Sequence, residues 1–205
     1  MSSYGTEQLI SWLKNLDVKS DRVIDIGGSQ NPIKGRTRSW DVKDYKILDL
    51  PEPHECKQKP DIITDLNESW TEDGIREVDE ELKDDGLEVT KYDMAFCLGV
   101  SEYWYNPIQA LKNIAQLLKP GGILYISFHF IYVVHSPVDQ DYLRYTPRGI
   151  EKILKETGFE ILRTQPKIEF ENHIYDAMIK NKMKVAREGY DRHHWIGGLV
   201  KAKKI

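Results

Sequence analysis

The sequence predicts an α/β fold in which a mostly parallel sheet is covered by helices on both faces. Residues 23–26 read Val-Ile-Asp-Ile, and a strand that is largely apolar on both faces belongs inside a sheet that helices cover. Apolar runs of strand length also alternate along the chain with stretches of helical spacing. Finally, Gly27 and Gly28 end the first strand in a sharp turn, and parallel sheets bind ligands at that edge.

Length and composition are those of one globular domain. The chain has 205 residues, of which 40% are hydrophobic and 30% charged, so we expect one domain over residues 1–205. Cys56 and Cys97 form neither a disulfide framework nor a zinc spacing, and the N-terminal residues do not read as a secretory signal. No apolar run is long enough to span a bilayer. These features predict a cytoplasmic protein without a membrane span.

The charge is slightly acidic and unevenly distributed. The net charge of −4 and the pI near 5.9 argue against a nucleic-acid partner. Residues 65–88 nevertheless carry eleven acids against two bases, and residues 180–205 carry eight bases against two acids. One interpretation is two solvated faces; the other is that the basic tail contacts an anionic acceptor.

The chain begins with a helix, a strand and a loop. Thr6 suits an N-cap, and a helix within residues 1–20 is predicted by apolar residues at helical spacing: Leu9, Trp12, Leu13 and Leu16. Residues 21–26 form the first strand. Residues 33–44 contain few apolar side chains, so we expect a loop where an α/β unit would normally have a helix.

The middle of the chain supplies three strands. Residues 45–50 and 61–65 read as the second and third strands, and residues 92–98 as a buried fourth. Residues 66–91 form an acidic insertion with too few apolar residues to be buried. The insertion is therefore expected outside the core.

Two helices have clear start and stop signals. Asn106 and Thr146 each precede a proline, which is the usual order of an N-cap and a first helical residue. The Lys-Pro-Gly-Gly segment at residues 119–122 ends the first of these helices, and Gly158 ends the second. Three more strands complete a set of seven: residues 123–130, 159–162 and 195–202.

The glycine turn excludes two common phosphate-binding motifs. A Walker loop ends in Gly-Lys-Ser/Thr, which this chain lacks. The dinucleotide fingerprint G-x-G-x-x-G, started at Gly27, would place Ser29 and Pro32 at its second and third glycine positions. A proline there removes an N–H that would face the phosphate and obstructs close packing of helix on strand. We therefore expect neither NAD nor a nucleoside triphosphate.

Five segments occur in an order that is typical of another family. They are VIDIGGSQNP, PDIITDLNE, YDMAFCLGVSEYWYNP, LLKPGGILYIS and HSPVDQDYLRYTPRGIEKILKETGFEI. Together they resemble the class I S-adenosylmethionine-dependent methyltransferases, with the closest likeness to the small-acceptor group often labelled type 11. The resemblance covers about residues 22–162.

The resemblance implies a Rossmann-like, seven-stranded sheet whose last strand is antiparallel. It also implies S-adenosyl-L-methionine as cofactor and S-adenosyl-L-homocysteine as product. Residues 131–146 and 167–192 would then be loops or a helix on the acceptor side. The partner would be a small-molecule acceptor with an oxygen or nitrogen nucleophile, in a monomeric or dimeric enzyme.

The cofactor carries no phosphate, so a cationic or N–H-rich site is not required. Its two ribose hydroxyls instead need a carboxylate, because an ionised acid can accept both hydrogen bonds. Asp49, at the end of the second strand, is the predicted residue, and Asp41 is the alternative. Asp49 could instead only cap the turn before Pro51. Asp65 would accept from the adenine amino group while the Leu66 N–H reaches a ring nitrogen, although Asp65 could also be a plain N-cap.

The remaining cofactor contacts are expected around the first and fourth strands. Gly27 and Gly28 would allow a close approach of the methionine end, with Ser29 in place of the family's last glycine. Asp25, a buried acid that needs partners, would orient the glycine turn through backbone N–H groups. The other predicted cofactor contacts are Leu50, and Leu98, Gly99 and Val100 on the methionine and sulfonium side.

A general base is useful when the acceptor is a hydroxyl or an ammonium group. The candidates are His135, Glu102 and His129, of which His135 has the most polar surroundings. The acceptor side is predicted to include Tyr103, Asp141, Tyr142 and Arg144. Alternatively, His135, Asp141 and Arg144 form a structural cluster that orders the loop. His193 and His194 are interpreted as polar surface, and no metal site is expected.

Three functions remain open from the sequence. The first is methyl transfer to a small-molecule acceptor by direct displacement. The second is methylation of RNA or another macromolecule, for which the basic tail would provide a contact. The third is a non-catalytic module that binds S-adenosylmethionine, an alternative that the missing last glycine at Ser29 keeps open.

Overall fold

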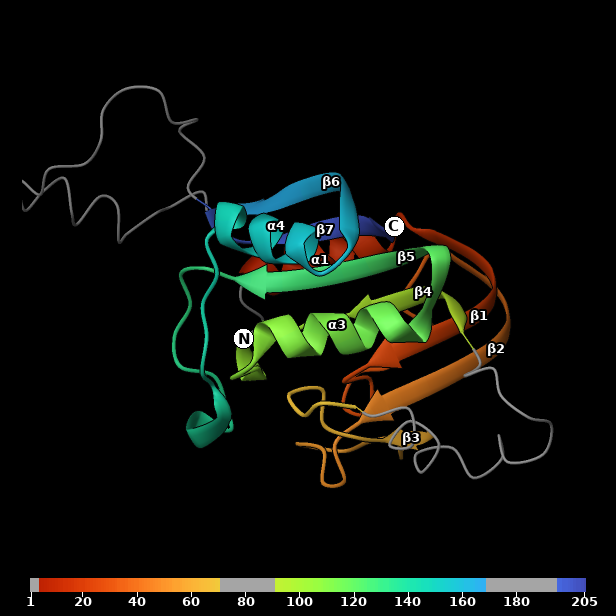
Figure 1. The fold of residues 1–205 in the computed structure, drawn as a ribbon, viewed down its shortest axis with the longest axis horizontal. Helices are drawn as coiled ribbons and strands as arrows, with labels where there is room; N and C mark the ends of the chain where they lie inside the picture. Colours follow the sequence, from red (N-terminus) through yellow and green to blue (C-terminus); the bar gives the residue numbers. More distant parts are fainter. Residues whose placement is uncertain (1–3, 71–90, 169–194) are drawn as a thin grey trace, which may run out of the picture.

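The computed structural model describes residues 4–70, 91–168 and 195–205. They form a seven-stranded sheet in the order β3-β2-β1-β4-β5-β7-β6 (Figure 1). β7 is antiparallel to both of its neighbours, and the other pairs are parallel, which confirms the predicted fold class. The strands are β1 (Asp17–Ile26), β2 (Ser39–Asp49), β3 (Ile62–Ile63), β4 (Tyr92–Cys97), β5 (Leu118–His129), β6 (Phe159–Ile168) and β7 (Trp195–Lys204).

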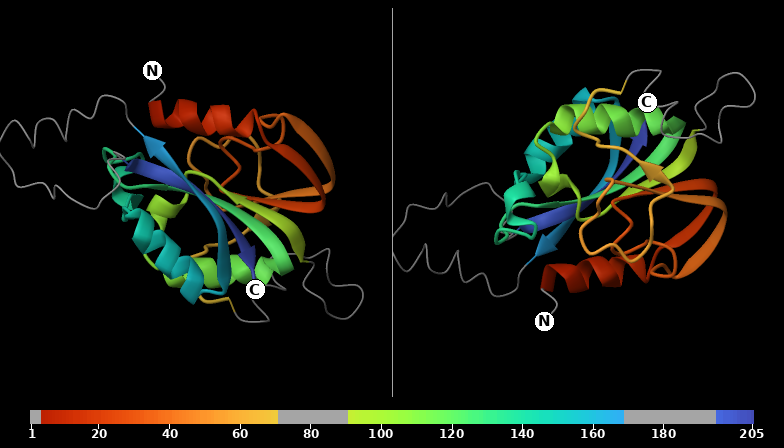
Figure 2. Two further views of the ribbon diagram at one scale, coloured as in Figure 1. Left: turned by 90° about the horizontal axis from the view of Figure 1, so that it is seen from above. Right: turned by 90° about the horizontal axis from the view of Figure 1, so that it is seen from below.

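Helices lie on both faces of the sheet (Figure 2). They are α1 (Tyr4–Leu13) on one face, and α3 (Pro107–Leu117) and α4 (Pro147–Glu156) on the other. The predicted caps are confirmed, because the side chains of Asn106 and Thr146 accept from the N–H groups of Gln109 and Gly149. Thr6 is not a cap, since it lies inside α1.

Three strands begin earlier than predicted. The expected loop at residues 33–44 is confirmed only for residues 33–38, because β1 starts at Asp17 and β2 at Ser39. β5 starts at Leu118, so the segment at residues 119–122 lies within this strand, directly after α3 ends at Leu117.

The first halves of β1 and β2 pair with each other as a ribbon whose outer face is polar (the polar ribbon), where Lys43 binds Asp21 at 2.7 Å. Its inner face is apolar, because Val18, Trp40 and Val42 pack with the core under α1. The alternation of polar and apolar residues at 39–43 is a strand signal that the prediction overlooked.

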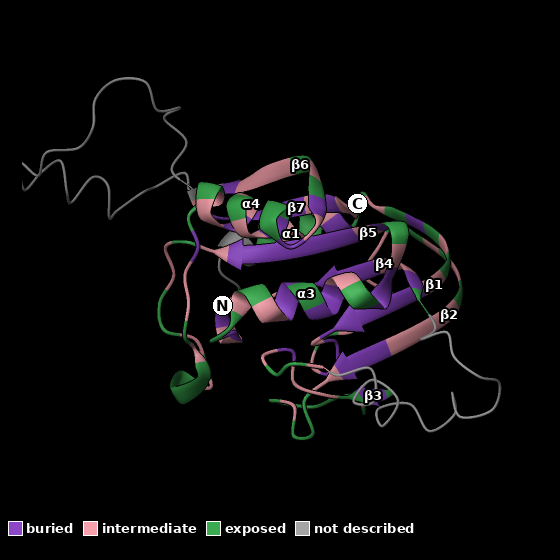
Figure 3. Ribbon diagram, viewed as in Figure 1, coloured by how far each residue is buried: buried purple, intermediate pink, exposed green. Residues whose placement is uncertain are grey.

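Two hydrophobic cores fill the spaces between the sheet and the helices. The core under α3 and α4 is centred on strand residues such as Ile24, Leu124 and Ile126, and the core under α1 includes Leu13, Phe96 and Tyr125. The central strands between the two cores are largely buried (Figure 3). β1 and β4 therefore lie in the middle of the sheet and are covered on both sides, as the apolar run at residues 23–26 predicted.

Parts of the predicted insertions fall outside the described residues. These are residues 71–90 of the acidic insertion 66–91, residues 169–192 of the excursion 167–192, and the pair His193–His194. Within the described ranges, no helix is both long and apolar enough to cross a membrane.

Candidate active site

A cavity of about 230 Å³ opens at the carboxyl edge of the sheet, beside the ends of β1, β2 and β4. β1 is where the strand order reverses, because β2 and β3 lie on one side of it and β4 and β5 on the other. Ligands of open α/β sheets bind outside the carboxyl ends of the strands at such a switch point. Two short 3₁₀ turns lie next to this edge, η2 (Ser101–Tyr103) and η3 (Val138–Gln140).

The glycine turn after β1 forms one wall of the cavity. Gly27 has a φ of +71° and its N–H donates to the Leu48 carbonyl at 2.8 Å, which ties the turn to β2. A Cβ on Gly27 would overlap Cγ2 of Val100, and a Cβ on Gly28 would lie 2.6 Å from the carboxyl carbon of Asp25. The two glycines therefore let the backbone pass between the end of β4 and a buried carboxylate.

Replacing Gly27 by alanine tests this close approach. We expect Gly27→Ala to lower the free energy of unfolding by about 2 kcal/mol or more, since left-handed strain adds to a displacement of Val100. Gly35→Ala is the matched control, because Gly35 has a φ of +87° with nothing within 4 Å of its Cβ position. Urea denaturation of both variants separates the cost of the overlap with Val100 from the cost of the left-handed backbone strain. An equal decrease in the free energy of unfolding in the two variants would show that Val100 moves aside without cost.

Asp25 supports the turn from beneath. It is 3% exposed, and its Oδ2 accepts from the Ile33 N–H and from the Tyr45 hydroxyl, each at 2.7 Å. Burial raises the pKa of Asp25 to about 6, and these two hydrogen bonds oppose the rise. The N–H that Asp25 binds follows the glycine turn rather than belonging to it. Tyr45, which the sequence analysis did not single out, is the second donor.

Asp49 ends β2 and lines the cavity. Its Oδ2 accepts from the Ser29 N–H at 3.1 Å and its Oδ1 from the Leu50 N–H at 2.9 Å. A carboxylate oxygen can accept two hydrogen bonds, so each oxygen retains capacity for a ligand hydroxyl. Ser29 is fully buried, and its carbonyl accepts from the N–H groups of Lys57 and Gln58. The serine that replaces a glycine here is thus part of a well-anchored loop.

Asp41, the alternative to Asp49, lies elsewhere on β2. It is eight residues earlier, about 26 Å away along the strand. Its side chain is 73% exposed and lies 3.7 Å from the Lys19 ammonium. Asp41 therefore belongs to the polar ribbon and not to the cavity.

Asp65 and Leu66 line the cavity beyond β3. Oδ1 of Asp65 accepts from the main-chain N–H and the side-chain amide of Asn67, at 2.8 and 2.9 Å. These bonds cap a turn, and residues 66–70 form no helix of which Asp65 could be the N-cap. Oδ2 of Asp65 and the Leu66 N–H have no hydrogen-bond partner among the described residues. The Leu66 carbonyl accepts from the buried Asn113 amide of α3 at 3.0 Å, which fixes this segment.

The wall after β4 is formed by Gly99 and Val100. Gly99 has a φ of +71°, and its N–H donates to the Ser127 hydroxyl at 2.8 Å. Nothing lies within 4 Å of its Cβ position, so the backbone there faces open space. Leu98 instead packs into the core on the α1 side of the sheet, and does not line the cavity.

Tyr103 and His135 both line the cavity and contact each other. The Tyr103 hydroxyl donates to the Ser136 carbonyl at 2.7 Å and also contacts Nδ1 of His135. A phenol has one proton, so with that proton on Ser136 the Nδ1 atom must donate. The neutral ring then keeps its lone pair on Nε2. His135 can therefore act as a base toward a ligand in the cavity.

Asp141 and Arg144 order the loop that carries His135. Asp141 accepts from the His135 main-chain N–H, and Arg144 binds both carboxylate oxygens and the Val133 carbonyl. The Asp141 side chain is fully buried. This pair holds the backbone of the loop, whereas the His135 ring binds Tyr103. Tyr142, also predicted on the acceptor side, is 50% exposed and lies outside the cavity lining.

Three ionisable side chains, Glu102, His129 and Lys167, lie largely buried outside the cavity lining. His129 and Lys167 both lie opposite Gly197 of β7, on its two sides. Glu102 is 1% exposed, its Oε1 is 3.5 Å from His129 Nε2, and its Oε2 has no partner in the described parts of the chain. Burial raises the pKa of Glu102 to about 7, and lowers those of His129 to about 3 and Lys167 to about 8.

The cavity brings together about half of the predicted site residues. Those that line it are Gly27, Asp49, Leu50, Asp65, Leu66, Gly99, Val100, Tyr103 and His135. Those that do not are Asp25, Gly28, Ser29, Leu98, Glu102, His129, Asp141, Tyr142 and Arg144. Other lining residues, among them Gln30, Asn67 and Trp104, were not predicted from the sequence. Asn67 could have been noticed in the PDIITDLNE segment, since it directly follows two predicted contacts.

The fold and the cavity define a class I methyltransferase: a seven-stranded sheet with an antiparallel β7, and acids at the ends of β2 and β3 in a cavity at the switch point. The family model of a methyltransferase domain matches residues 8–124. The chain belongs to this family and is an S-adenosylmethionine-dependent methyltransferase. No curated protein matches the chain.

Solved structures share the fold at low sequence identity. One similar chain belongs to the complex between the Trm112 methyltransferase activator of Haloferax volcanii and a methyltransferase. It is 13% identical with a TM-score of 0.57, and the match covers 98% of this chain and 88% of that one. The N-methyltransferase NodS of Bradyrhizobium japonicum WM9, solved with S-adenosylhomocysteine, is 13% identical with a TM-score of 0.54, covering 98% and 87%. The 1,6-didemethyltoxoflavin-N1-methyltransferase of Burkholderia thailandensis is 15% identical with a TM-score of 0.51, covering 98% and 76%.

The described lining suits S-adenosylmethionine, the cofactor of this class. The ligand has two ribose hydroxyls, a sulfonium cation and no phosphate. The lining offers acids, among them Asp49 and Asp65, and includes no Lys or Arg in the part of the chain that the structure describes. No group of three or more potential metal ligands occurs among the described residues.

Proposed function

We propose that the protein transfers the methyl group of S-adenosylmethionine to an oxygen or nitrogen atom of a small-molecule acceptor. The bound cofactor supplies a methyl group on a sulfonium, which is already activated for displacement, and leaves as S-adenosylhomocysteine. The chain then has to align the acceptor and accept its proton. The observation that carries the proposal is the cavity itself, whose lining includes Asp49, Asp65 and His135.

Asp49 is the proposed ribose ligand. Both of its carboxylate oxygens are already oriented by N–H groups, from Ser29 and Leu50, so the side chain loses little freedom when it binds. Asp65 Oδ2 and the Leu66 N–H are proposed to bind the adenine, because both groups lack partners among the described residues. The methionine end is assigned to the part of the cavity lined by Gly27 and Gly99.

His135 is proposed as the general base. Its Nδ1 is engaged with Tyr103, which leaves Nε2 to take the acceptor proton as the bond to the methyl group forms. Glu102 and His129 do not line the cavity. They are proposed to influence the acceptor side only through their charge, from the buried cluster next to Tyr103. Asp141 and Arg144 are proposed to position the His135 loop.

The His135→Ala variant separates catalysis from cofactor binding. We expect turnover to fall by about 10²–10⁴-fold, the usual contribution of a general base, while affinity for S-adenosylhomocysteine changes less than about threefold. Tyr103→Phe, which removes the hydroxyl that orients the ring, should give a smaller loss of turnover. Unchanged turnover in His135→Ala would show that His135 is not the general base.

An acceptor with an apolar part suits the mouth of the cavity. His135 and Pro137 line the cavity, while Val133, Val134 and Val138 beside them are 76%, 63% and 71% exposed. The Asp141–Arg144 pair holds this loop, so the exposure of the valines is imposed by a fixed backbone. Apolar side chains exposed beside a cavity favour a ligand that covers them.

Formation of S-adenosylhomocysteine from different acceptor pools tests the proposal. We expect product with a filtrate of small metabolites and a similar rate at about 50 mM and about 200 mM salt, since few phosphate contacts are involved. Purified total RNA serves as the competing acceptor pool. Activity on RNA alone, with a steep decrease at the higher salt, would favour a nucleic-acid acceptor instead.

A further inference from the structure

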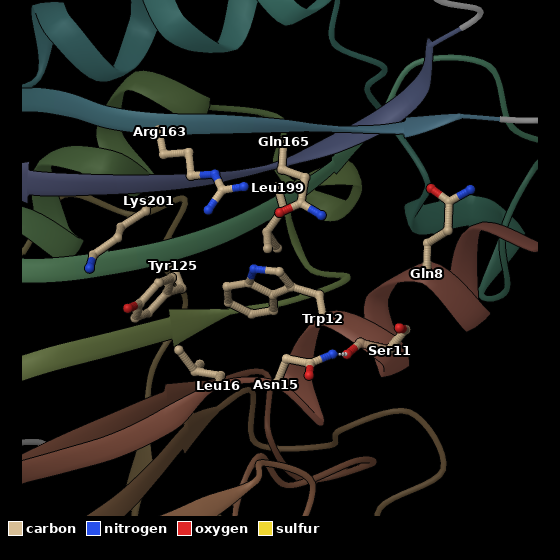
Figure 4. Close-up of a pocket in the computed structure, with 10 residues that line it drawn as sticks. All are labelled: Gln8, Ser11, Trp12, Asn15, Leu16, Tyr125, Arg163, Gln165, Leu199 and Lys201. Carbon is tan, nitrogen blue, oxygen red and sulfur yellow. Dashed lines mark hydrogen bonds between the residues drawn. The ribbon is translucent and has the colours of Figure 1, made fainter.

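A second cavity, of about 660 Å³, lies between α1 and the strands β5, β7 and β6 (Figure 4). It shares no lining residue with the cofactor cavity. Its floor is rigid and aromatic: Tyr125 is 4% exposed, stacks on Phe96 at 5.1 Å between ring centroids, and meets the edge of Trp12 at 5.3 Å. Leu199 continues this apolar floor on β7.

The strand register places two cations side by side above this floor. Lys201 of β7 lies opposite Tyr125 of β5 on one side and opposite Arg163 of β6 on the other. Directly opposite residues of antiparallel strands project from the same face, with Cβ atoms about 5 Å apart, and like charges in such a pair destabilise the sheet. Arg163 is exposed and Lys201 is half-buried, and we expect this pair to cost some stability in the unliganded fold.

A bulge in β6 creates this pairing. The register shifts between Ile161 and Arg163, so that Leu162 is an extra residue without a partner in the ladder. In a regular strand Leu162 would lie opposite Lys201. The bulge places Arg163 there instead, and bulges often redirect a side chain next to a functional site.

Neither cation is neutralised by the protein in the described ranges. Arg163 and Lys201 make no ion pair there, whereas Lys203, two residues further along β7, binds Glu160 at 2.6 Å. The ammonium of Lys201 lies 5.5 Å from the centre of the Tyr125 ring, a contact that leaves its charge in place. Acids are not scarce in a chain with a net charge of −4. An uncompensated pair of cations in a cavity thus points to an anion from outside.

We propose that this cavity binds a small planar molecule that carries a carboxylate or phosphate group. The anion would lie between Arg163 and Lys201, where a guanidinium can donate two parallel hydrogen bonds to it. The planar part would rest on Trp12, Tyr125 and Leu199, which offer an aromatic and apolar surface. Gln165, beside Arg163 on β6, offers an amide at the rim. Binding relieves the repulsion between the two cations.

Calorimetric titration with benzoate, phenyl phosphate and benzyl alcohol tests the proposal. Excess S-adenosylhomocysteine is present to occupy the cofactor cavity. We expect at least one of the two anions to bind, and the neutral alcohol to bind about tenfold more weakly or worse. Arg163→Gln should weaken the anion at least about tenfold. Lys203→Gln, which makes the same charge change on the neighbouring strand, should bind as the wild type does. No binding of either anion, or equal weakening in both variants, would overturn the proposal.

Thermal unfolding without any probe gives a second readout. Arg163→Gln should raise Tm, because it removes a like-charge pair, whereas Lys203→Gln should lower it or leave it unchanged, because it breaks an ion pair. A lower Tm in Arg163→Gln would show that the two cations do not repel each other, and the reason for a bound anion would be gone. Neither readout depends on the assignment of the cofactor cavity.

Discussion

Asp49→Ala is expected to weaken S-adenosylhomocysteine binding by about 10²–10⁴-fold. The substitution removes two hydrogen bonds between a charged acceptor and the ribose hydroxyls, each worth about 1.5–3 kcal/mol. It also removes the acceptor of the Ser29 N–H, so the glycine turn loses one of its anchors. Isothermal titration of the purified variant measures the effect.

Two further variants make the result specific. Asp41→Ala removes the other candidate carboxylate, which is exposed at the far end of β2, and should bind like the wild type. Asp49→Asn keeps one acceptor oxygen and the shape of the side chain, so its loss should be intermediate. If Asp41→Ala loses affinity while Asp49→Ala keeps it, the ribose is held elsewhere than proposed.

Glu102→Gln is expected to stabilise the protein at alkaline pH by up to about 3 kcal/mol. Burial raises the pKa of the Glu102 carboxyl from 4.5 to about 7, and each pH unit corresponds to about 1.4 kcal/mol. The folded state therefore holds this proton more tightly than the unfolded chain. Its contribution is full below pH 4.5 and is lost as the pH rises through about 7. Glutamine imitates the protonated acid at every pH.

Urea denaturation between about pH 5 and about pH 8 measures this difference. The two proteins should be similarly stable at the acidic end, and the variant should become progressively more stable above it. Glu156→Gln, which changes a carboxylate that is 53% exposed, should follow the wild type throughout. A constant difference between Glu102→Gln and the wild type across this range would show that Glu102 does not titrate there.

The fold was largely predictable because its signals are local. The apolar run at residues 23–26 requires cover on both faces, and the caps at Asn106 and Thr146 mark where two helices begin. The early halves of β1 and β2 were not predicted, although residues 39–43 alternate polar and apolar side chains. The exposed ion pairs between them, such as Lys43–Asp21, join residues far apart in the sequence and leave no local pattern.

The site was predictable where it depends on strand ends. The carboxyl ends of parallel strands meet at one edge, so Gly27, Asp49 and Gly99 could be expected around one cavity. The partners that hold this edge were not predictable. Tyr45 binds Asp25 and Asn113 binds Leu66 through contacts that leave no pattern in the sequence.

The predicted base candidates illustrate the same limit. Glu102 and Tyr103 are neighbours on one 3₁₀ turn, yet Tyr103 lines the cavity and Glu102 points away from it into a buried cluster. Lys167 of that cluster comes from β6, more than sixty residues later. Sequence proximity to a site thus identified the turn, but not which of its side chains faces the ligand.

A crystal structure of the protein with S-adenosylhomocysteine tests the central claim most directly. We expect both ribose hydroxyls within hydrogen-bond distance of the Asp49 carboxylate, the adenine beside Asp65 and Leu66, and the sulfur facing Tyr103 and His135. A ribose bound away from Asp49, or a sulfur that faces neither Tyr103 nor His135, would contradict the proposed site.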